Sequence, residues 1–580
     1  MSDDGVLFLV PARGGSVRVP GKNLRLVAGI PLVARAARTA RLAAATVPGG
    51  PHAVVCSTDD PVVAATARAW GAEVPFLRPA SLADATATSV DVALHAIDTL
   101  AAAGRSFRAL VLVQPTSPLT EPGDLVAAVA AFDAGGRSVV AVTASHPATF
   151  HVTSAGDGRV TPLDGDDPRT AGHVLSGAFY VTGVADLRRT RRFTEPGATR
   201  GLVVPAERSV DVDEAEDLVV AEAFAHARPP RPLRVAGHDI GAGPVFVVAE
   251  GGVNHNGDPA FAHRLVDAAA DARADAVKFQ TFDPDALAAA GAPMADYQRA
   301  SGERGHDQRE MLARLALPAD AWAGLQRHAH ERGLVFLSTP FDAGSAALLD
   351  RLDVPAFKIG SGELTNLPFI ELVAGYGRPM LLSTGMADMR EVAEAVDALR
   401  AAGDPPFGLF HCVSSYPAAP EDANLRAIAT LRAAFGVPAG WSDHTQGLEL
   451  PVAAVALGAS LVEKHLTLDR TMPGPDHAAS LEPDAFATMT AAIRAVERAV
   501  GDGDKRPVAA ERGVAAVARR SLHWTRDVAA GSVVAATDLV ALRPATGLSP
   551  ARLRDVLGRR TAHPVEAGEP VVTGDLEGDE

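Results

Sequence analysis

The chain has 580 residues, so at roughly 150 residues per domain it is expected to form three or four domains. Its 54 lysines and arginines and 70 aspartates and glutamates give a formal net charge of −16, which argues against binding to nucleic acid or to an anionic membrane surface. With two cysteines, an acidic amino terminus and no uncharged apolar stretch of about 18 residues, the sequence is not typical of a disulfide-stapled, secreted or membrane-spanning protein, and a cytoplasmic location is expected.

Two Pro-rich or charge-rich breaks divide the chain. Residues 228–232 (RPPRP) are typical of a semi-rigid linker, and residues 501–507 (GDGDKRP) form a second break. We therefore predict three domains, over residues 1–228, 235–505 and 516–580.

The first predicted domain alternates short apolar runs with Ala-rich helical stretches. Apolar strands separated by helices predict a largely parallel, doubly wound α/β sheet that is covered on both faces. The candidate strands are Val6–Val10, Ala53–Ser57, Leu110–Val113, Ser138–Val142 and Ala178–Val181.

A basic, Gly-rich turn, residues 11–23 (PARGGSVRVPGKN), follows the first strand directly. Backbone N–H groups in such a turn can approach phosphates, and Arg13, Arg18 and Lys22 add positive charge. The turn is not a Walker A loop, since Asn23 stands where a Ser or Thr would bind magnesium. On these residues alone, a phosphate site and an ordinary basic turn are both open.

Further motifs give this domain a resemblance to the CMP-sialic acid synthetases, the cytidylyltransferases that activate sialic-type sugars. They occur in the family's order: Ser57-Thr58-Asp59, Arg78-Pro79, Leu112–Leu119 (LVQPTSPL), Gly177–Tyr180 (GAFY) and Asp211-Val212-Asp213. The resemblance implies a nucleotidyltransferase-like fold that binds CTP and a nonulosonic acid. It also implies transfer of CMP to the acid's anomeric hydroxyl with release of pyrophosphate.

Charge builds up on phosphoryl oxygens in this reaction, so cations are needed. By resemblance, Asp211 and Asp213 hold Mg²⁺; their spacing puts both on one face of an extended segment, although such pairs are usually solvated. The resemblance also implies residues that contact CTP, and Arg13 and Lys22 among them would be catalytic. The full set is Arg13, Ser16, Lys22, Asn23, Arg78, Ser89 and Gln114. The chain departs from the family at Ala85, where an Asp is usual and Asp84 stands one residue early, and at Ser176, where an Asn is usual.

The second predicted domain repeats the strand–helix alternation with greater regularity. Eight such units in about 270 residues favour a (β/α)₈ TIM barrel, with a doubly wound sheet as the alternative. The candidate strands are Val245–Ala249, Asp275–Phe279, Leu334–Leu337, Ala356–Ile359, Met380–Leu382, Phe407–Phe410, Val437–Trp441 and Ser460–Val462.

Polar side chains lie at or just beyond the ends of all these strands. A barrel gathers its strand ends on one face, where active sites are built, so the pattern predicts an enzyme. The residues in question are Glu250, Lys278, Thr339, Lys358, Ser383, His411, Ser442 with His444, and His465.

A run of ordered motifs gives the barrel a resemblance to the sialic acid synthases. The motifs are Ala249–Gly257 (AEGGVNHNG), Val277–Thr281 (VKFQT), Ser338–Phe341 (STPF), Phe357–Glu363 (FKIGSGE), Leu382–Met386 (LSTGM), Ser442–Thr445 (SDHT), Glu463–His465 (EKH) and Pro473–Asp476 (PGPD). The resemblance implies condensation of phosphoenolpyruvate with an N-acetylmannosamine-type sugar and release of phosphate.

Phosphoenolpyruvate carries two anionic groups, so its pocket needs cations and hydroxyls. The implied set is Lys278, Thr339, Lys358, Ser361, Ser383, Ser442 and Ser414, the last in place of a family Asn; both lysines would be catalytic. Two histidines with water and substrate oxygens suit Mn²⁺ or a similar metal, and by resemblance these are His444 and His465.

The remaining barrel residues concern the sugar and the proton transfers. Glu250 is the candidate for proton handling. The resemblance implies that Gln280, Tyr416 and Asp476 contact the sugar. Gly251 replaces a family Ile and is expected to loosen the packing beside Glu250.

The last block contains short β-like runs and Gly turns, and it resembles the antifreeze-like (SAF) module of these synthases at Arg520-Ser521-Leu522 and Arg543-Pro544. The resemblance implies a homodimer or higher oligomer in which this module covers the partner's barrel. Arg543 would then contact the sugar's N-acyl group; the alternative is a surface arginine.

Together these features predict a bifunctional enzyme that makes a sialic-type acid and joins it to CMP. Two alternatives stay open. The sugar could be a legionaminic-type 6-deoxy diacetamido compound, or one half could be inactive and serve as a binding or scaffold domain.

Overall fold

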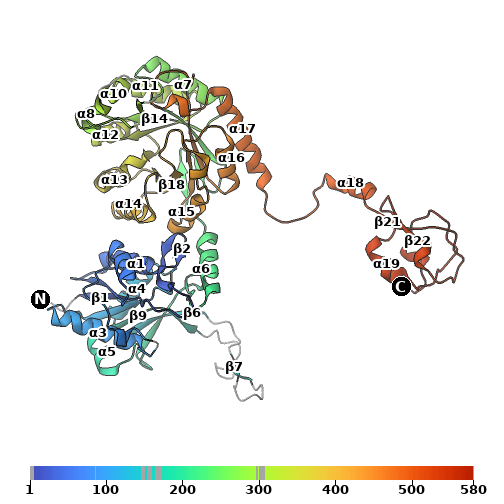
Figure 1. Ribbon diagram of the computed structural model, residues 1–580, viewed down its shortest axis with the longest axis horizontal. Helices are drawn as coiled ribbons and strands as arrows, with labels where there is room; N and C mark the ends of the chain where they lie inside the picture. Colours follow the sequence, from blue (N-terminus) through green and yellow to red (C-terminus); the bar gives the residue numbers. More distant parts are fainter. Residues whose placement is uncertain are drawn as a thin grey trace. The chain divides into compact units, whose positions relative to one another are not determined.

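The structure is a computed structural model that describes residues 5–84, 86–144, 150–152, 160–162, 173–295, 298–299 and 307–578 (Figure 1). The chain forms two compact units, Met1–Ala499 and Val500–Glu580. The first contains both sheets that the sequence predicts. The finer division at residues 228 and 235 stays a prediction.

The first sheet has six strands in the order β10-β6-β9-β5-β1-β4. All neighbouring strands are parallel except β9, which runs antiparallel to β5 and β6. The bounds are β1 Val6–Pro11, β4 Ala53–Ser57, β5 Ala109–Val113, β6 Ser138–Ala144, β9 His173–Gly183 and β10 Thr199–Val203. This confirms the doubly wound sheet and each strand that was predicted for it.

Helices cover both faces of this sheet, which is why its central strands are apolar throughout. Val6, Phe8 and Val10 of β1 belong to one buried cluster, whereas Leu7 and Leu9 belong to another. The covering helices and the next one along the chain are α1 Leu32–Thr46, α2 Pro61–Ala69, α3 Ser89–Ala102, α4 Pro122–Asp133, α5 Val184–Thr190 and α6 Ala215–Ala227. Three short strand pairs complete this region and the entry to the barrel: β2 Leu26–Val27 with β3 Ile30–Pro31, β7 Phe150–Val152 with β8 Val160–Pro162, and β11 Leu233–Val235 with β12 His238–Ile240.

The second sheet has eight parallel strands in the order β15-β14-β13-β20-β19-β18-β17-β16. Its first strand in sequence, β13, pairs with both β14 and the last strand, β20, and the edge strands β15 and β16 are in contact. Such closure is that of a TIM-type barrel and rules out the doubly wound alternative. The bounds are β13 Phe246–Gly252, β14 Ala276–Thr281, β15 Val335–Pro340, β16 Phe357–Ile359, β17 Met380–Ser383, β18 Phe407–Cys412, β19 Ala439–Asp443 and β20 Leu461–His465.

The β11–β12 hairpin closes the amino-terminal end of the barrel. Its Leu233, Val235 and Ile240 share a buried cluster with inward residues such as Phe246 near the strand starts. The opposite, carboxyl-terminal end is therefore the one that can hold a site. The barrel helices are α7 Pro259–Asp271, α8 Pro284–Leu287, α10 Gln308–Leu315, α11 Ala321–Glu331, α12 Ala343–Arg351, α13 Leu367–Ala374, α14 Met389–Ala401, α15 Ala427–Phe435, α16 Glu449–Ala456 and α17 Pro483–Val500.

A fully buried ion pair joins β19 to β20. Lys464 Nζ lies 2.6 Å from Asp443 Oδ2, and both side chains have no solvent exposure. We expect Lys464→Met to lower the free energy of unfolding of the barrel by about 3–5 kcal/mol, because it leaves the Asp443 carboxylate buried and unpaired. Urea unfolding followed by tryptophan fluorescence measures this.

The matched control removes both charges. In the Asp443→Leu/Lys464→Met double variant no unpaired charge is left, so most of the lost stability should return. A Lys464→Met single variant as stable as the parent would contradict the ion pair.

The second unit is small and rich in turns, as predicted. Strands β21 Ser521–Trp524 and β22 Leu539–Leu542 pair antiparallel, and the two helices are α18 Glu511–Ala518 and α19 Leu553–Val556. Its core gathers around Trp524 and Val571. Across both units, none of the described helices combines the length and the apolar character that crossing a bilayer requires.

Candidate active sites

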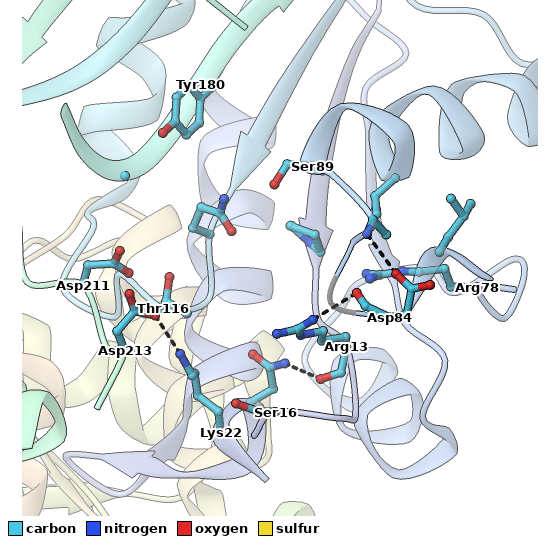
Figure 2. Close-up of a pocket in the computed structure, with 17 residues that line it drawn as sticks. Arg13, Ser16, Lys22, Arg78, Asp84, Ser89, Thr116, Tyr180, Asp211 and Asp213 are labelled. Carbon is cyan, nitrogen blue, oxygen red and sulfur yellow. Dashed lines mark hydrogen bonds and ion pairs between the residues drawn. The ribbon is translucent and has the colours of Figure 1, made fainter. Parts of the chain in front are cut away.

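A cavity of about 440 Å³ opens beside the carboxyl end of β1 in the first sheet (Figure 2). Its lining brings together all nine residues that the sequence predicts for CTP and Mg²⁺, from five separate stretches of chain. They are Arg13, Ser16, Lys22, Asn23, Arg78, Ser89, Gln114, Asp211 and Asp213. The role of each residue stays a prediction, whereas the finding that all nine line one cavity is independent of those roles.

The basic turn is fixed by hydrogen bonds that leave Arg13 and Lys22 facing the cavity. Asn23 Nδ2 donates to the backbone oxygen of Arg13 at 2.8 Å. Lys22 Nζ donates to the Val212 oxygen at 2.7 Å and to Asp213 Oδ1 at 3.1 Å, a contact that Figure 2 shows. Lys22 therefore ties the turn to the acidic segment across the cavity.

The acidic pair fits a hard divalent cation. Desolvation by the cavity walls raises the pKa of Asp211, although solvent reaches the residue, and the negative charge of Asp213 acts in the same direction. Both carboxylates line one cavity, so a cation between them would relieve this repulsion. Oxygen donors are the ligands that Mg²⁺ prefers.

The lining of this cavity differs from the prediction at Arg18, which is absent from it, and at three polar residues that were not predicted. Arg18 was expected to add charge to the phosphate site, but its Nη1 lies 3.7 Å from Asp213 and 3.4 Å from Glu214, and it is not among the lining residues. Asp84, Thr116 and Tyr180 line the cavity as well. Thr116 and Tyr180 lie inside the quoted LVQPTSPL and GAFY motifs, so the sequence contained the information from which they could have been predicted.

The departure at Ala85 falls on a residue outside the described part of the chain. Asp84, its neighbour, accepts hydrogen bonds from Thr86 and from the Ala87 backbone. Its own backbone oxygen accepts a bond of 3.1 Å from Arg13 Nη1. Asp84 therefore shapes the loop that holds Arg13.

A second cavity, of about 470 Å³, lies at the carboxyl ends of the barrel strands. It brings together all the barrel residues predicted to bind phosphoenolpyruvate, the sugar or the metal and to handle protons. They are Glu250, Lys278, Gln280, Thr339, Lys358, Ser361, Ser383, Ser414, Tyr416, Ser442, His444, His465 and Asp476. Arg543 belongs to the second unit, where it is exposed, and its predicted role is untested.

Two lysines form the charged floor of this cavity. Lys278 Nζ lies 2.7 Å from Glu250 and donates to Thr339 Oγ1 at 3.0 Å. Lys358 Nζ donates to Ser383 Oγ at 2.8 Å. Both lysines are buried, so they are desolvated cations beside hydroxyl donors, as an anionic ligand requires.

Glu463 is the residue that sequence reasoning missed. It lies between the lysines, 3.1 Å from Lys358 Nζ and 3.8 Å from Lys278 Nζ, and it accepts a 3.0 Å hydrogen bond from Ser442. The quoted Glu463-Lys464-His465 motif held the signal. Its negative charge lies close to both lysines and offsets part of their positive charge.

The pKa values of the two glutamates are shifted in opposite directions because their surroundings differ. Burial by itself raises the pKa of both. At Glu463 the charges of Lys278 and Lys358 overcome burial, and its pKa is lowered. At Glu250 burial prevails, helped by the charge of Glu463, and its pKa is raised. Glu250 is therefore the carboxyl group that can take up and give back a proton.

His444 and His465 stand on neighbouring strand ends with ring centroids 5.6 Å apart. His444 Nδ1 lies 2.7 Å from the Val413 oxygen, which orients the ring and leaves Nε2 for a metal. Burial lowers the pKa of His444 to about 4 and that of His465 well below the usual value, so both rings are neutral, as metal ligands must be.

The pair therefore fits a divalent metal. In the described ranges no group of three or more His, Cys, Asp or Glu side chains is arranged to hold an ion. A metal held by this pair would need further ligands from substrate or water. Both rings line the same cavity as Lys278 and Lys358.

Two expectations about the barrel are wrong. His411 is the last residue but one of β18, but it packs its ring against Trp441, hydrogen-bonds the Ala423 oxygen at 2.8 Å and does not line the cavity. Gly251 does not loosen the packing: a Cβ there would lie 2.8 Å from the ring of Phe279, which already fills the space.

The sequence matches three family models: "NeuB family" over residues 265–505, "Cytidylyltransferase" over 7–149 and "SAF domain" over 519–577. Among curated relatives, an N,N'-diacetyllegionaminic acid synthase of Legionella pneumophila is 40% identical over 331 residues, which are 56% of this chain and 92% of that protein. The enzyme of the same name from Campylobacter jejuni is 41% identical over 54% of this chain and 95% of its own.

A more distant relative is the N-acetylneuraminate-9-phosphate synthase of Mus musculus, 33% identical over 58% of this chain and 94% of its own. These proteins match almost throughout their length. The chain therefore belongs to the NeuB family, with a cytidylyltransferase domain ahead of the barrel and a SAF domain behind it.

Proposed function

We propose that the chain catalyses two successive reactions of CMP-nonulosonic acid synthesis. The barrel condenses phosphoenolpyruvate with an N-acyl hexosamine to give a nonulosonic acid and phosphate. The amino-terminal domain transfers CMP from CTP to that acid and releases pyrophosphate. The observation that carries the proposal is that one chain holds two separate cavities, each lined by groups suited to one of these reactions.

In the barrel, Lys278 and Lys358 with their hydroxyl neighbours bind the phosphate and carboxylate of phosphoenolpyruvate. A divalent metal of Mn²⁺ type, held by His444 and His465, would act as a Lewis acid toward the sugar aldehyde. C3 of phosphoenolpyruvate forms the new bond to the aldehyde carbon. Water then adds at C2, and the C–O bond to phosphate breaks.

Glu250 supports the proton transfers of this sequence. Its carboxyl group lies beside Lys278 and accepts a hydrogen bond from Gln280 Nε2 at 3.2 Å, which sets its orientation in the cavity. A proton taken from the attacking water can be held there and returned to a substrate oxygen.

In the first domain, Arg13 and Lys22 face the triphosphate, and Asp211 with Asp213 would hold Mg²⁺ beside it. The acid's anomeric oxygen attacks the α-phosphorus, and pyrophosphate leaves. CTP and phosphoenolpyruvate are metabolites of the cytoplasm, where we place both reactions.

A specific observation favours a legionaminic-type sugar over N-acetylmannosamine as the acceptor. Val253, Met311, Leu312 and Leu315 form an apolar wall of the barrel cavity. Such a wall suits the methyl group of a 6-deoxy sugar better than a hydroxymethyl group. The relatives at 40% and 41% identity carry the legionaminic name.

A panel of acceptor sugars tests the proposal. The purified chain is incubated with phosphoenolpyruvate, Mn²⁺ and either a 6-deoxy-2,4-diacetamido hexose or N-acetylmannosamine, and phosphate release is measured. We expect the diacetamido sugar to give the higher kcat/KM. A higher value for N-acetylmannosamine would reverse the choice of sugar, and no release with any N-acyl hexosamine would overturn the synthase assignment.

We also propose that the SAF domain covers the barrel of a partner subunit in a homodimer and presents Arg543 to the sugar. His465→Ala and Arg543→Ala each inactivate the synthase in this arrangement. When the two variants are mixed under subunit exchange, hybrids contain one barrel with an intact His465 and an intact Arg543 above it. We expect up to about a quarter of the parent phosphate release to return, and no recovery would contradict the exchange of domains.

A further inference from the structure

A third cavity, of about 670 Å³, lies in the first unit where the cytidylyltransferase part meets the barrel. None of its lining residues lines either candidate active site. Six arginines contribute to its walls, against the two acidic residues Glu121 and Glu207: they are Arg35, Arg38, Arg208, Arg228, Arg231 and Arg400. The cavity is therefore a cationic site that neither reaction uses.

The walls are held together by a buried carboxylate. Asp397 of α14 accepts from Arg38 Nη2 at 2.5 Å and from Arg41 Nη2 at 2.5 Å, both on α1. Beside it, Leu32 and Ala433 belong to one apolar cluster that draws residues from both parts of the unit. Asp397 is thus hydrogen-bonded to two arginines of α1, and its negative charge also acts on Arg400.

Most of the remaining arginines also have carboxylate partners. Arg208 lies 2.6 Å from Glu121 and 2.9 Å from Asp124, and Arg228 lies 2.6 Å from Glu121. Arg231 pairs with Asp404 at 2.8 Å. The positive charges of these three arginines are therefore largely balanced by carboxylates of the protein itself.

Arg35 and Arg400 are the exceptions. Arg35 donates through Nε to the Val27 oxygen at 2.8 Å, but its buried Nη2 has no hydrogen-bond partner, and it forms no ion pair with any residue the structure describes. Arg400 donates to the Phe435 oxygen at 3.0 Å, its Nε has no hydrogen-bond partner, and its nearest carboxylate, Asp404, is 3.9 Å away.

The electrostatics agree with this geometry. Burial, and after it the positive charge of Arg38, lowers the pKa of Arg35 and of Arg400 to about 10 in each case. Both guanidinium groups thus lie within the field of the same third arginine, and the opposing charges, Glu222 for Arg35 and Asp404 with Asp397 for Arg400, do not offset burial. A bound anion would lower the free energy of all three.

We propose that this cavity binds an organic phosphate, with the phosphate group held by Arg35 and Arg400. The planar guanidinium fork matches a phosphate with two parallel hydrogen bonds. Leu42, Leu119 and Phe435 add apolar surface beside the arginines, which suits the carbon part of such a ligand. The cavity is larger than the one proposed for CTP, at about 670 against about 440 Å³, so a nucleotide-sized molecule fits.

The ligand site would also link the two halves of the unit. Arg35 comes from α1 of the cytidylyltransferase part, whereas Arg400 comes from α14 of the barrel part. An anion bound to both adds a contact between the parts that is absent when the site is empty.

Equilibrium dialysis of the full chain tests the proposal with three separate probes: labelled inorganic phosphate, pyrophosphate and CMP. We expect the parent to bind one equivalent more of at least one probe than the Arg35→Gln/Arg400→Gln variant, or to bind that equivalent at least tenfold more tightly. The probe that shows the difference identifies the source of the phosphate. Equal stoichiometry and affinity for all three probes would overturn the proposal.

Controls separate this site from the active sites and from misfolding. Arg351→Gln alters an exposed arginine outside the cavity and should bind as the parent does. Arg35→Lys keeps the charge and should retain part of the extra binding. If the double variant does not fold, Arg400→Gln is measured alone, and it should show the same weakening.

A tungstate soak of crystals gives the position directly. We expect an anomalous peak within hydrogen-bonding reach of Arg35 and Arg400. Peaks confined to the two active-site cavities would contradict the site.

Discussion

Replacement of His465 by alanine is expected to reduce phosphate release from phosphoenolpyruvate by more than about 100-fold, because even outer-shell substitutions at metal sites cost about 10–100-fold. His465 is one of only two imidazoles that line the barrel cavity among the described residues, so the metal would keep a single protein ligand. CTP-dependent pyrophosphate release from a supplied nonulosonic acid should be unchanged, since the first cavity shares no residue with the second.

The control for this experiment is His411→Gln. His411 also lies near the end of a barrel strand, but it faces Trp441 and the Ala423 oxygen, and glutamine can still donate to that oxygen. We expect the variant to release phosphate at nearly the parent rate. If a folded His465→Ala protein also lost pyrophosphate release, the two sites would not be independent. If it released phosphate at the parent rate, His465 would not be a metal ligand.

Asp213→Ala is expected to have the opposite effect. The substitution removes one of two carboxylates that would hold Mg²⁺ and also the partner of Lys22 Nζ at 3.1 Å. Pyrophosphate release should fall by more than about 100-fold, by the same reasoning on metal ligands, while the condensation in the barrel continues. Separate assays of phosphate and pyrophosphate on the same preparation measure both.

Glu216→Ala is the matched control for Asp213→Ala. Glu216 is an exposed acidic residue three positions along the chain, and it does not line the cavity. Its substitution removes a negative charge of the same neighbourhood without touching the proposed site. If it reduced pyrophosphate release as strongly as Asp213→Ala, general electrostatics rather than metal binding would explain both results.

The strands of both sheets except β10 could be predicted to within a few residues because they are apolar on both faces. Strand β10 was missed because none of its residues is fully buried. Val6, Leu7, Phe8, Leu9 and Val10 are all fully buried, so the run carries no polar interruption. Barrel closure could not be derived from this pattern, because a doubly wound sheet has the same alternation. It depends on the long-range pairing of β13 with β20.

The polar residues of the barrel could be found from their place at strand ends, as Glu250 and Lys278 show. His411 shows the limit of that rule. Its position on the strand can be read from the sequence, but the contacts of its ring with Trp441 and the Ala423 oxygen cannot. Glu463 was missed for a related reason. It lies inside β20, where its charge is balanced by two lysines from other strands, and no local pattern reveals those partners.

The mass of the product from the complete reaction tests the central claim, that one chain carries both reactions. The purified protein is given phosphoenolpyruvate, CTP, Mg²⁺, Mn²⁺ and an N-acyl hexosamine that supports phosphate release. We predict a CMP-linked nonulosonic acid, formed with equal amounts of phosphate and pyrophosphate. A free nonulosonic acid that accumulates without any CMP conjugate, or no acid at all from any such sugar, would contradict the account.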